Sequence, residues 1–200
     1  SKHPTRQWLS KEEAKTLIDN GLIELKKFST SDNPDIVFAS CGDTPNIETL
    51  AAVSILKKFI PNIKLRVLNI LEVLKLESDK RNPFGLTDTK FNAYFTKDKP
   101  VIFDFHGYPA FIHSLLYDRE NKNFLVHGYL EEGSITTAFD MRLRNKIDRF
   151  SLLEDALNYL PDTKEKEALK EYIEEELKKH YSYVKEYGLD LEEITNFALE

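Results

Sequence analysis

Short apolar runs alternate with segments of helical periodicity along the first 160 residues of this 200-residue chain. The apolar runs cover residues 35–40, 64–70, 101–105 and 124–127, and runs of this kind are typical of strands that are buried on both faces. Between the first two runs, apolar residues recur at helical spacing from Ile47 to Phe59. Because alternating strands and helices require crossover connections, we predict an α/β fold, a three-layer α/β/α sandwich with a mostly parallel sheet.

Polar residues at the segment boundaries predict where helices begin and end. Ser10 and Glu13 form a capping box, and the helix that they start should run to about Gly21. Pro45 is expected at the first position of the next helix. Thr87 and Thr137 are further capping residues, and helices should follow Thr137 through about residue 159.

The composition of the chain changes after Pro161. Residues 163–187 are rich in charge but keep an apolar stripe at helical spacing, which predicts a helix with one packed face and one solvated face. We therefore divide the chain into an α/β domain, residues 1–160, and a C-terminal helical extension, residues 161–200, packed on that domain.

Composition and charge exclude several classes of protein. The formal net charge of −6 argues against a general nucleic-acid surface, which requires clustered Lys and Arg. A single cysteine, Cys41, excludes an internal disulfide and a cysteine-based zinc site, and this pattern suits a cytoplasmic protein. There is no run of 18 apolar residues, so a membrane span is not expected.

The candidate functional residues are sought where the predicted strands end, because ligands of parallel sheets bind at the carboxyl ends of the strands. His106 and Tyr108 follow the third strand and are candidates for a domain contact or a functional turn; a buried hydrogen-bonding role is the alternative. His113 and His127 are expected to be structural, since the histidine spacing matches no local metal motif. Cys41 is expected to be a packed small residue, because the chain has no nucleophile elbow around it.

No cofactor motif is complete. Gly42-Asp43-Thr44 lacks the second glycine of the Gly-Asp-Gly segment that opens a thiamine diphosphate site, and no Gly-x-Gly-x-x-Gly or Walker loop occurs. Helix N-termini near Thr44 and Thr137 leave open an alternative function, a regulatory anion- or nucleotide-binding module. The residues alone predict an α/β domain that lacks a self-contained active site.

Several distinctive segments follow one another in order along residues 1–160. They include Gln7-Trp8-Leu9, Gly42-Asp43-x-Pro45, Gly128-Tyr129-x-Glu131-Glu132-Gly133, Asn145-x-x-Asp148-Arg149-Phe150 and, most specific, Phe95-Thr96-x-Asp98-Lys99-Pro100-Val101-Ile102-Phe103-x-Phe105-His106-Gly107-Tyr108-Pro109. Together they resemble the C-terminal domain of the phosphoketolase family.

The resemblance implies the third domain of a transketolase-like homodimeric lyase. Phosphoketolases cleave xylulose 5-phosphate or fructose 6-phosphate with inorganic phosphate, and they form acetyl phosphate and an aldose phosphate. The family uses thiamine diphosphate as an electron sink, with Mg²⁺, between its N-terminal and middle domains. The motifs of those domains are absent here, so the isolated chain is expected to be non-catalytic and to support the dimer and the substrate channel.

One functional residue carries over from the family. Phosphoketolases have a Lys in a Gly-Lys-x-Pro segment just before Gln-Trp-Leu, where it contacts substrate phosphate. Lys2, in Ser1-Lys2-His3-Pro4, stands at the matching position, although Ser1 replaces the family glycine. The resemblance thus implies a substrate phosphate-binding role for Lys2.

Overall fold

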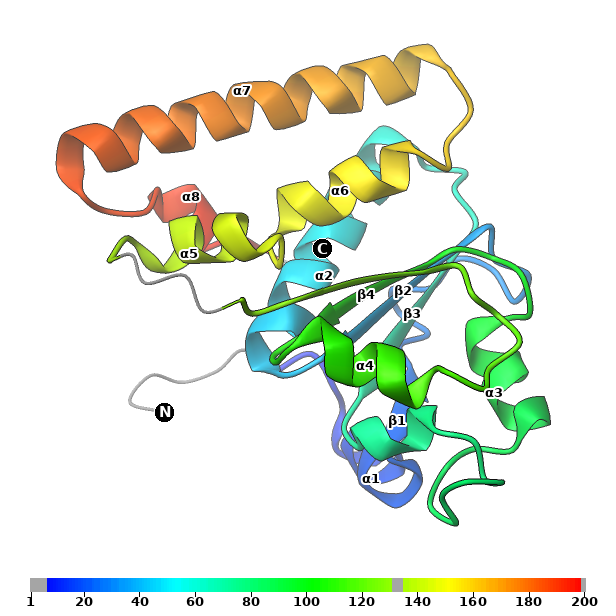
Figure 1. The fold of residues 1–200 in the computed structure, drawn as a ribbon. Coiled ribbons are helices and arrows are strands. Elements are labelled where there is room, and N and C mark those ends of the chain that lie inside the picture. The colour runs from blue at the N-terminus through cyan, green and yellow to red at the C-terminus, as the bar shows by residue number, and fades with distance from the viewer. Residues whose placement is uncertain (1–6, 131–134, 199–200) are drawn as a thin grey trace.

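A five-stranded sheet forms the centre of the chain in the computed structural model, which describes residues 7–130 and 135–198 (Figure 1). The strands are β1 (Leu22–Glu24), β2 (Ile36–Cys41), β3 (Leu65–Ile70), β4 (Val101–Phe105) and β5 (Phe124–Gly128), and they lie side by side in the order β1-β3-β2-β4-β5. Strands β2 to β5 are mutually parallel, and β1 is antiparallel to β3. The predicted fold class and the four predicted strands are confirmed. Strand β1 was not predicted, because three residues are too few to show a period.

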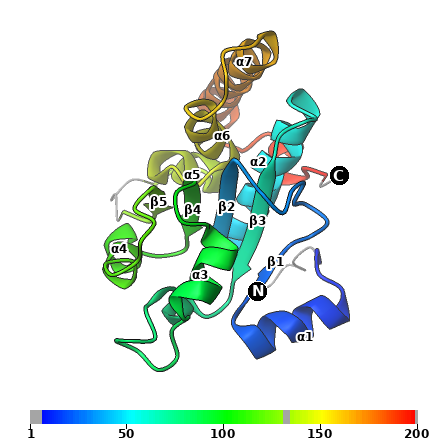
Figure 2. The ribbon, with the colours of Figure 1, turned by 90° about the vertical axis from the view of Figure 1, so that its right-hand side faces the viewer.

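Helices cover both faces of the sheet (Figure 2). One face packs against α2 (Asp43–Phe59), α5 (Ala138–Asn145) and α6 (Arg149–Leu157), and the long helix α7 (Lys164–Tyr187) and the short helix α8 (Glu192–Thr195) add to this layer. The other face packs against α3 (Asp88–Phe95), α4 (Pro109–Leu115) and the short 3-10 helix η1 (Val73–Leu76). Helix α1 (Lys11–Asn20) lies beside the edge strand β1.

The central strand β2 shows why its sequence is apolar without interruption. Ile36 and Phe38 point into the core on the α2 side, whereas Val37 and Ala39 point into the core on the α3 side. Since successive side chains of a strand point to opposite faces, a strand covered on both faces needs apolar residues at every position.

The predicted helix boundaries are confirmed with one exception. Ser10 and Glu13 form both hydrogen bonds of the capping box, and Gly21 ends α1 in the left-handed conformation, with φ 76°. The prediction for Pro45 is wrong, because α2 begins at Asp43 and Gly42 is its N-cap. Gly42 has φ 116°, which L-residues rarely adopt, so the chain turns into the helix earlier than the proline suggested. Pro45 still lies in the first turn, where backbone N–H groups have no partner within the helix.

Helix α7 lies across α6 and α2 on the outside of the molecule (Figure 1). Thr163 caps its first turn, and Leu169 and Ile173 are buried in the same core as Phe38 of the sheet. The apolar stripe predicted for residues 163–187 is therefore the packed face of this helix.

A buried ion pair joins the helices of this layer. The Glu48 carboxylate of α2 is inaccessible to solvent and accepts hydrogen bonds from Arg149 Nε at 2.8 Å and Arg149 Nη2 at 3.0 Å. Arg142 Nη1 donates to the same carboxylate at 2.6 Å. Arg149 also donates to the backbone oxygen of Ile194 at 3.2 Å. Glu48 thereby connects α2, α5 and α6, and through Arg149 it reaches α8.

Replacing the Glu48 charge should destabilise the fold. Glu48→Gln keeps the shape of the side chain but leaves the buried Arg149 guanidinium without a counter-charge, so the free energy of unfolding should fall by about 3–5 kcal/mol. Urea unfolding followed by circular dichroism measures this change. The same substitution at the exposed Glu175 is the control and should change stability by less than about 0.5 kcal/mol. Equal stability of the two variants would contradict the prediction.

Candidate functional site

Three turns meet at the carboxyl ends of β2, β4 and β5. A Cβ atom on Gly42 would lie 2.5 Å from the Cβ of His106, and a Cβ atom on Gly128 would lie 2.1 Å from the backbone oxygen of Gly107. The His106 N–H also donates to the backbone oxygen of Cys41 at 3.0 Å. The turns therefore pack so closely that glycine is required at both points, against the His106 Cβ at Gly42 and against the Gly107 backbone at Gly128.

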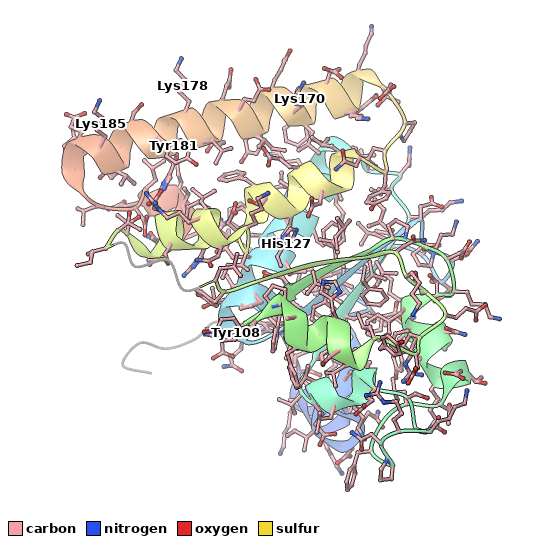
Figure 3. The ribbon with its side chains drawn as sticks, viewed as in Figure 1. Tyr108, His127, Lys170, Lys178, Tyr181 and Lys185 are labelled. Atoms are coloured by element: carbon pink, nitrogen blue, oxygen red, sulfur yellow. The ribbon has the colours of Figure 1, made fainter. Side chains whose placement is uncertain are left out.

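His106 and Tyr108 project from this rim. The His106 side chain is exposed, so the alternative of a buried hydrogen-bonding role is wrong. Its ring lies 4.9 Å from the ring of Tyr129, centroid to centroid. Tyr108 precedes the first residue of α4 and is 52% exposed, at the end of the molecule where the parallel strands finish (Figure 3).

Tyr129 was not predicted as a partner of His106. The signal for it is topological: Phe105 and Gly128 are paired in the register of β4 and β5, so the residues that follow them emerge side by side. The contact between His106 and Tyr129 could be predicted only if β4 and β5 were known to be neighbours.

Buried carboxyl groups lie beneath the rim, between β4 and the helices. Burial, together with the nearby Glu48 carboxylate, raises the pKa of Asp104 well above its ordinary value. Burial raises the pKa of Asp148 to about 6, even though Asp148 accepts hydrogen bonds from the backbone N–H groups of Phe150 and Ser151 at 2.8 and 3.1 Å. Asp148 is the N-cap of α6.

The remaining histidines do not join His106. His113 is exposed on α4, and His127 pairs with Asp155 of α6, between the sheet and that helix (Figure 3). His180 is buried in α7, with its ring 5.1 Å from that of Phe139. Within residues 7–130 and 135–198, no group of three or more His, Cys, Asp or Glu side chains could hold a metal ion.

Cys41 is not an activated nucleophile. The side chain packs against the apolar core beneath α3 and α4, as predicted, and burial raises the pKa of its thiol to about 11. At neutral pH the residue is therefore a thiol and not the reactive thiolate.

The N-terminus of α5 is already occupied by groups of the chain itself. Thr137 accepts a hydrogen bond from the Asp140 N–H at 3.2 Å, and the Asp190 carboxylate accepts one from the Phe139 N–H at 3.0 Å. An internal carboxylate thus stands where the alternative function would place a bound anion near Thr137. Lys2, the predicted substrate phosphate-binding residue, lies outside the described residues. Residues 131–134, which include Glu131-Glu132-Gly133 of the family segment, also lie outside them.

Comparison with known proteins identifies the family. The model described as the XFP C-terminal domain matches residues 2–199. A probable phosphoketolase of Pediococcus pentosaceus is 48% identical over 201 residues, which cover 99% of this chain and 26% of that protein. This chain belongs to the phosphoketolase family. A probable phosphoketolase of Clostridium acetobutylicum is 47% identical, and the xylulose-5-phosphate phosphoketolase of Lactiplantibacillus pentosus is 44% identical. Each alignment covers 98% of this phosphoketolase domain and 25% of the relative, so the chain spans about a quarter of their length.

The fold of the phosphoketolase domain is that of a transketolase C-terminal domain. A transketolase from Leishmania mexicana matches 74% of this chain and 19% of that protein, with a TM-score of 0.50 and 12% sequence identity. At this level of identity the likeness concerns the fold alone.

The residues described here do not fit a metal-held diphosphate such as that of thiamine diphosphate. The segment of the phosphoketolase domain that is most similar to a Gly-Asp cofactor motif is Gly42-Asp43. Asp43 is the first residue of α2. In the described ranges the domain has no group of three or more His, Cys, Asp or Glu side chains that could hold a metal ion. We therefore assign no catalytic step to this domain.

Within residues 7–130 and 135–198, none of the helices combines the length and the apolar character needed to cross a membrane.

The pKa of Asp148 makes stability depend on pH. Folding raises this pKa from 3.8 to about 6, so the protonated form stabilises the folded state; this contribution is complete below pH 4 and is lost as the pH rises through 6. The free energy of unfolding of the unmodified domain, relative to Asp148→Asn, should therefore fall by about 2 kcal/mol between pH 4 and pH 7. Urea titrations at several pH values measure it, with Asp98→Asn as the exposed control. A difference between wild type and Asp148→Asn that stays constant with pH would refute this assignment.

Proposed function

We propose that this chain is the non-catalytic C-terminal domain of a phosphoketolase. The complete enzyme would cleave xylulose 5-phosphate or fructose 6-phosphate with inorganic phosphate to acetyl phosphate and an aldose phosphate. The observation that carries the proposal is the family match over residues 2–199, in a chain that spans about a quarter of the length of its relatives. Thiamine diphosphate and Mg²⁺ would be bound by the N-terminal and middle domains of a cytoplasmic homodimer.

Within that enzyme the chain would contribute structure and one charge. Residues 1–160 would form the transketolase-like unit, and residues 161–200 the extension packed on it. The turn with His106 and Tyr108 would contact another domain or wall the substrate channel, a role supported by its exposure and by the tight packing of the three turns. Lys2 would bind substrate phosphate, as the family segment suggests.

The isolated chain should make no acetyl phosphate. It would be incubated with fructose 6-phosphate, inorganic phosphate, thiamine diphosphate and Mg²⁺, and acetyl phosphate would be trapped as the hydroxamate. We expect no product above the blank, whereas the complete enzyme that contains this domain should produce it. Turnover by the 200-residue chain alone would overturn the non-catalytic assignment, and an inactive complete enzyme would overturn the reaction.

Removing the Lys2 ammonium should weaken the binding of sugar phosphate by the complete enzyme. A hydrogen bond to a charged group contributes about 1.5–3 kcal/mol, so Lys2→Ala should raise the KM for fructose 6-phosphate about 10- to 150-fold. Steady-state kinetics measures the change, and Lys2→Arg should restore part of the affinity. Lys11→Ala, which removes an exposed charge on α1, should leave KM unchanged. If KM is also unchanged in Lys2→Ala, then Lys2 has no role in binding.

A further inference from the structure

A histidine is buried inside the helical layer that covers the α2 side of the sheet. His180, in the second half of α7, is inaccessible to solvent. Within residues 7–130 and 135–198, neither nitrogen of its ring has a hydrogen-bond partner. A neutral imidazole has one N–H donor and one nitrogen acceptor, and most buried polar groups in proteins are paired with protein groups or with ordered water. The two ring nitrogens of His180 therefore require an explanation.

A carboxylate oxygen close to this histidine is in the same situation. Asp190 lies in the connection from α7 to α8, and its Oδ2 accepts a hydrogen bond from the Phe139 N–H at 3.0 Å. Its Oδ1 is buried, and no donor reaches it from the described part of the chain. Phe139 also contacts the histidine, since its ring lies edge-on to that of His180 with 5.1 Å between the centroids. The unpaired atoms of His180 and Asp190 therefore lie around Phe139, where the C-terminal extension meets the start of α5 (Figure 1).

The charges at this junction are close to the ring, and one of them is already paired. Burial lowers the pKa of His180, whereas the carboxylates of Asp190 and Asp140 oppose this shift, so both lie near the ring. A lowered pKa favours the neutral imidazole at neutral pH. Asp140 supplies no donor, because its Oδ2 accepts hydrogen bonds from Thr136 Oγ1 and from Arg144 Nε.

A water molecule has the chemistry that these atoms require. Asp190 Oδ1 needs a donor, and the ring of His180 needs an acceptor for its N–H and a donor for its other nitrogen. Water can donate and accept at the same time, and buried waters in proteins typically make about three hydrogen bonds to groups of this kind. A metal ion is not supported, because the described ranges contain no group of three or more His, Cys, Asp or Glu side chains that could hold one.

We propose that an internal water molecule bridges the ring of His180 to Asp190 Oδ1 and so fastens the C-terminal extension to the start of α5. Through Asp190 the bridge continues to the Phe139 N–H, so one water connects α7, the connection to α8 and the first turn of α5. Loss of the water would leave the carboxylate bound through only one of its oxygens. The bridge is independent of the reaction proposed above, because it holds residues 161–200 on the domain.

Crystal structures of the complete enzyme at neutral pH test the bridge directly. In the unmodified enzyme we expect a water molecule about 3 Å from a ring nitrogen of His180 and from Asp190 Oδ1. His180→Phe keeps a ring against Phe139 but removes both nitrogens, so the water should be lost. His113→Phe changes an exposed histidine on α4 and should retain the water.

Hydrogen–deuterium exchange measures what the bridge does for the fold. The Phe139 amide should exchange at least about 10-fold faster in His180→Phe than in His113→Phe, because Asp190 is then held less firmly against α5. Amides of β2, at the centre of the sheet, should exchange equally in the two variants, since the change is local.

Three results would overturn the proposal. The first is a direct hydrogen bond between His180 and Asp190, or a site without water, in the unmodified enzyme; this result needs no variant, so it decides even if His180→Phe does not fold. The second is a metal ion in place of the water, recognised by ligand distances of about 2.0–2.6 Å. The third is equal exchange of the Phe139 amide in His180→Phe and His113→Phe.

Discussion

The helical layer on one side of the sheet depends on a carboxylate that water does not reach. Glu48 sits in α2, directly after the central strand, and its partner Arg149 lies 101 residues later in the chain. A buried charge without a partner is strongly destabilising, so this pair fixes how α2 meets α6. The Arg149 guanidinium also lies 5.4 Å from the ring centroid of Phe139 and 4.8 Å from that of Phe197, so the pair also positions α5 and the segment after α8.

The balance of charge around this pair explains why the buried aspartates below the strand ends favour their neutral forms. Asp104 and Asp148 add two carboxyl groups to a region whose guanidinium groups, on Arg142 and Arg149, already face Glu48. Burial raises the pKa of both aspartates, which favours their neutral forms and limits the buried negative charge. The polar groups beneath the strand ends thus serve internal packing.

The candidate site was predictable in part. The rule that parallel strands present their ligands at their carboxyl ends located His106 and Tyr108 on the correct edge. It did not reveal the Tyr129 ring beside His106, because that contact depends on β4 and β5 being neighbours. It also did not reveal that Glu48, which lies within the helical pattern of residues 47–59, is the buried acceptor for two arginines.

Local spacing by itself determined the α/β class, the four parallel strands and most of the helix ends, since caps and periodicity act over a few residues. The tertiary structure decided what distant residues do together: the strand order, the antiparallel β1, the early start of α2 at Gly42 and the burial of Glu48 against Arg149. It also decided which large apolar side chains stay exposed, Tyr108 and Leu130 among them. These features depend on which segments approach one another in space, and the free energy of such contacts is not encoded in the spacing of neighbouring residues.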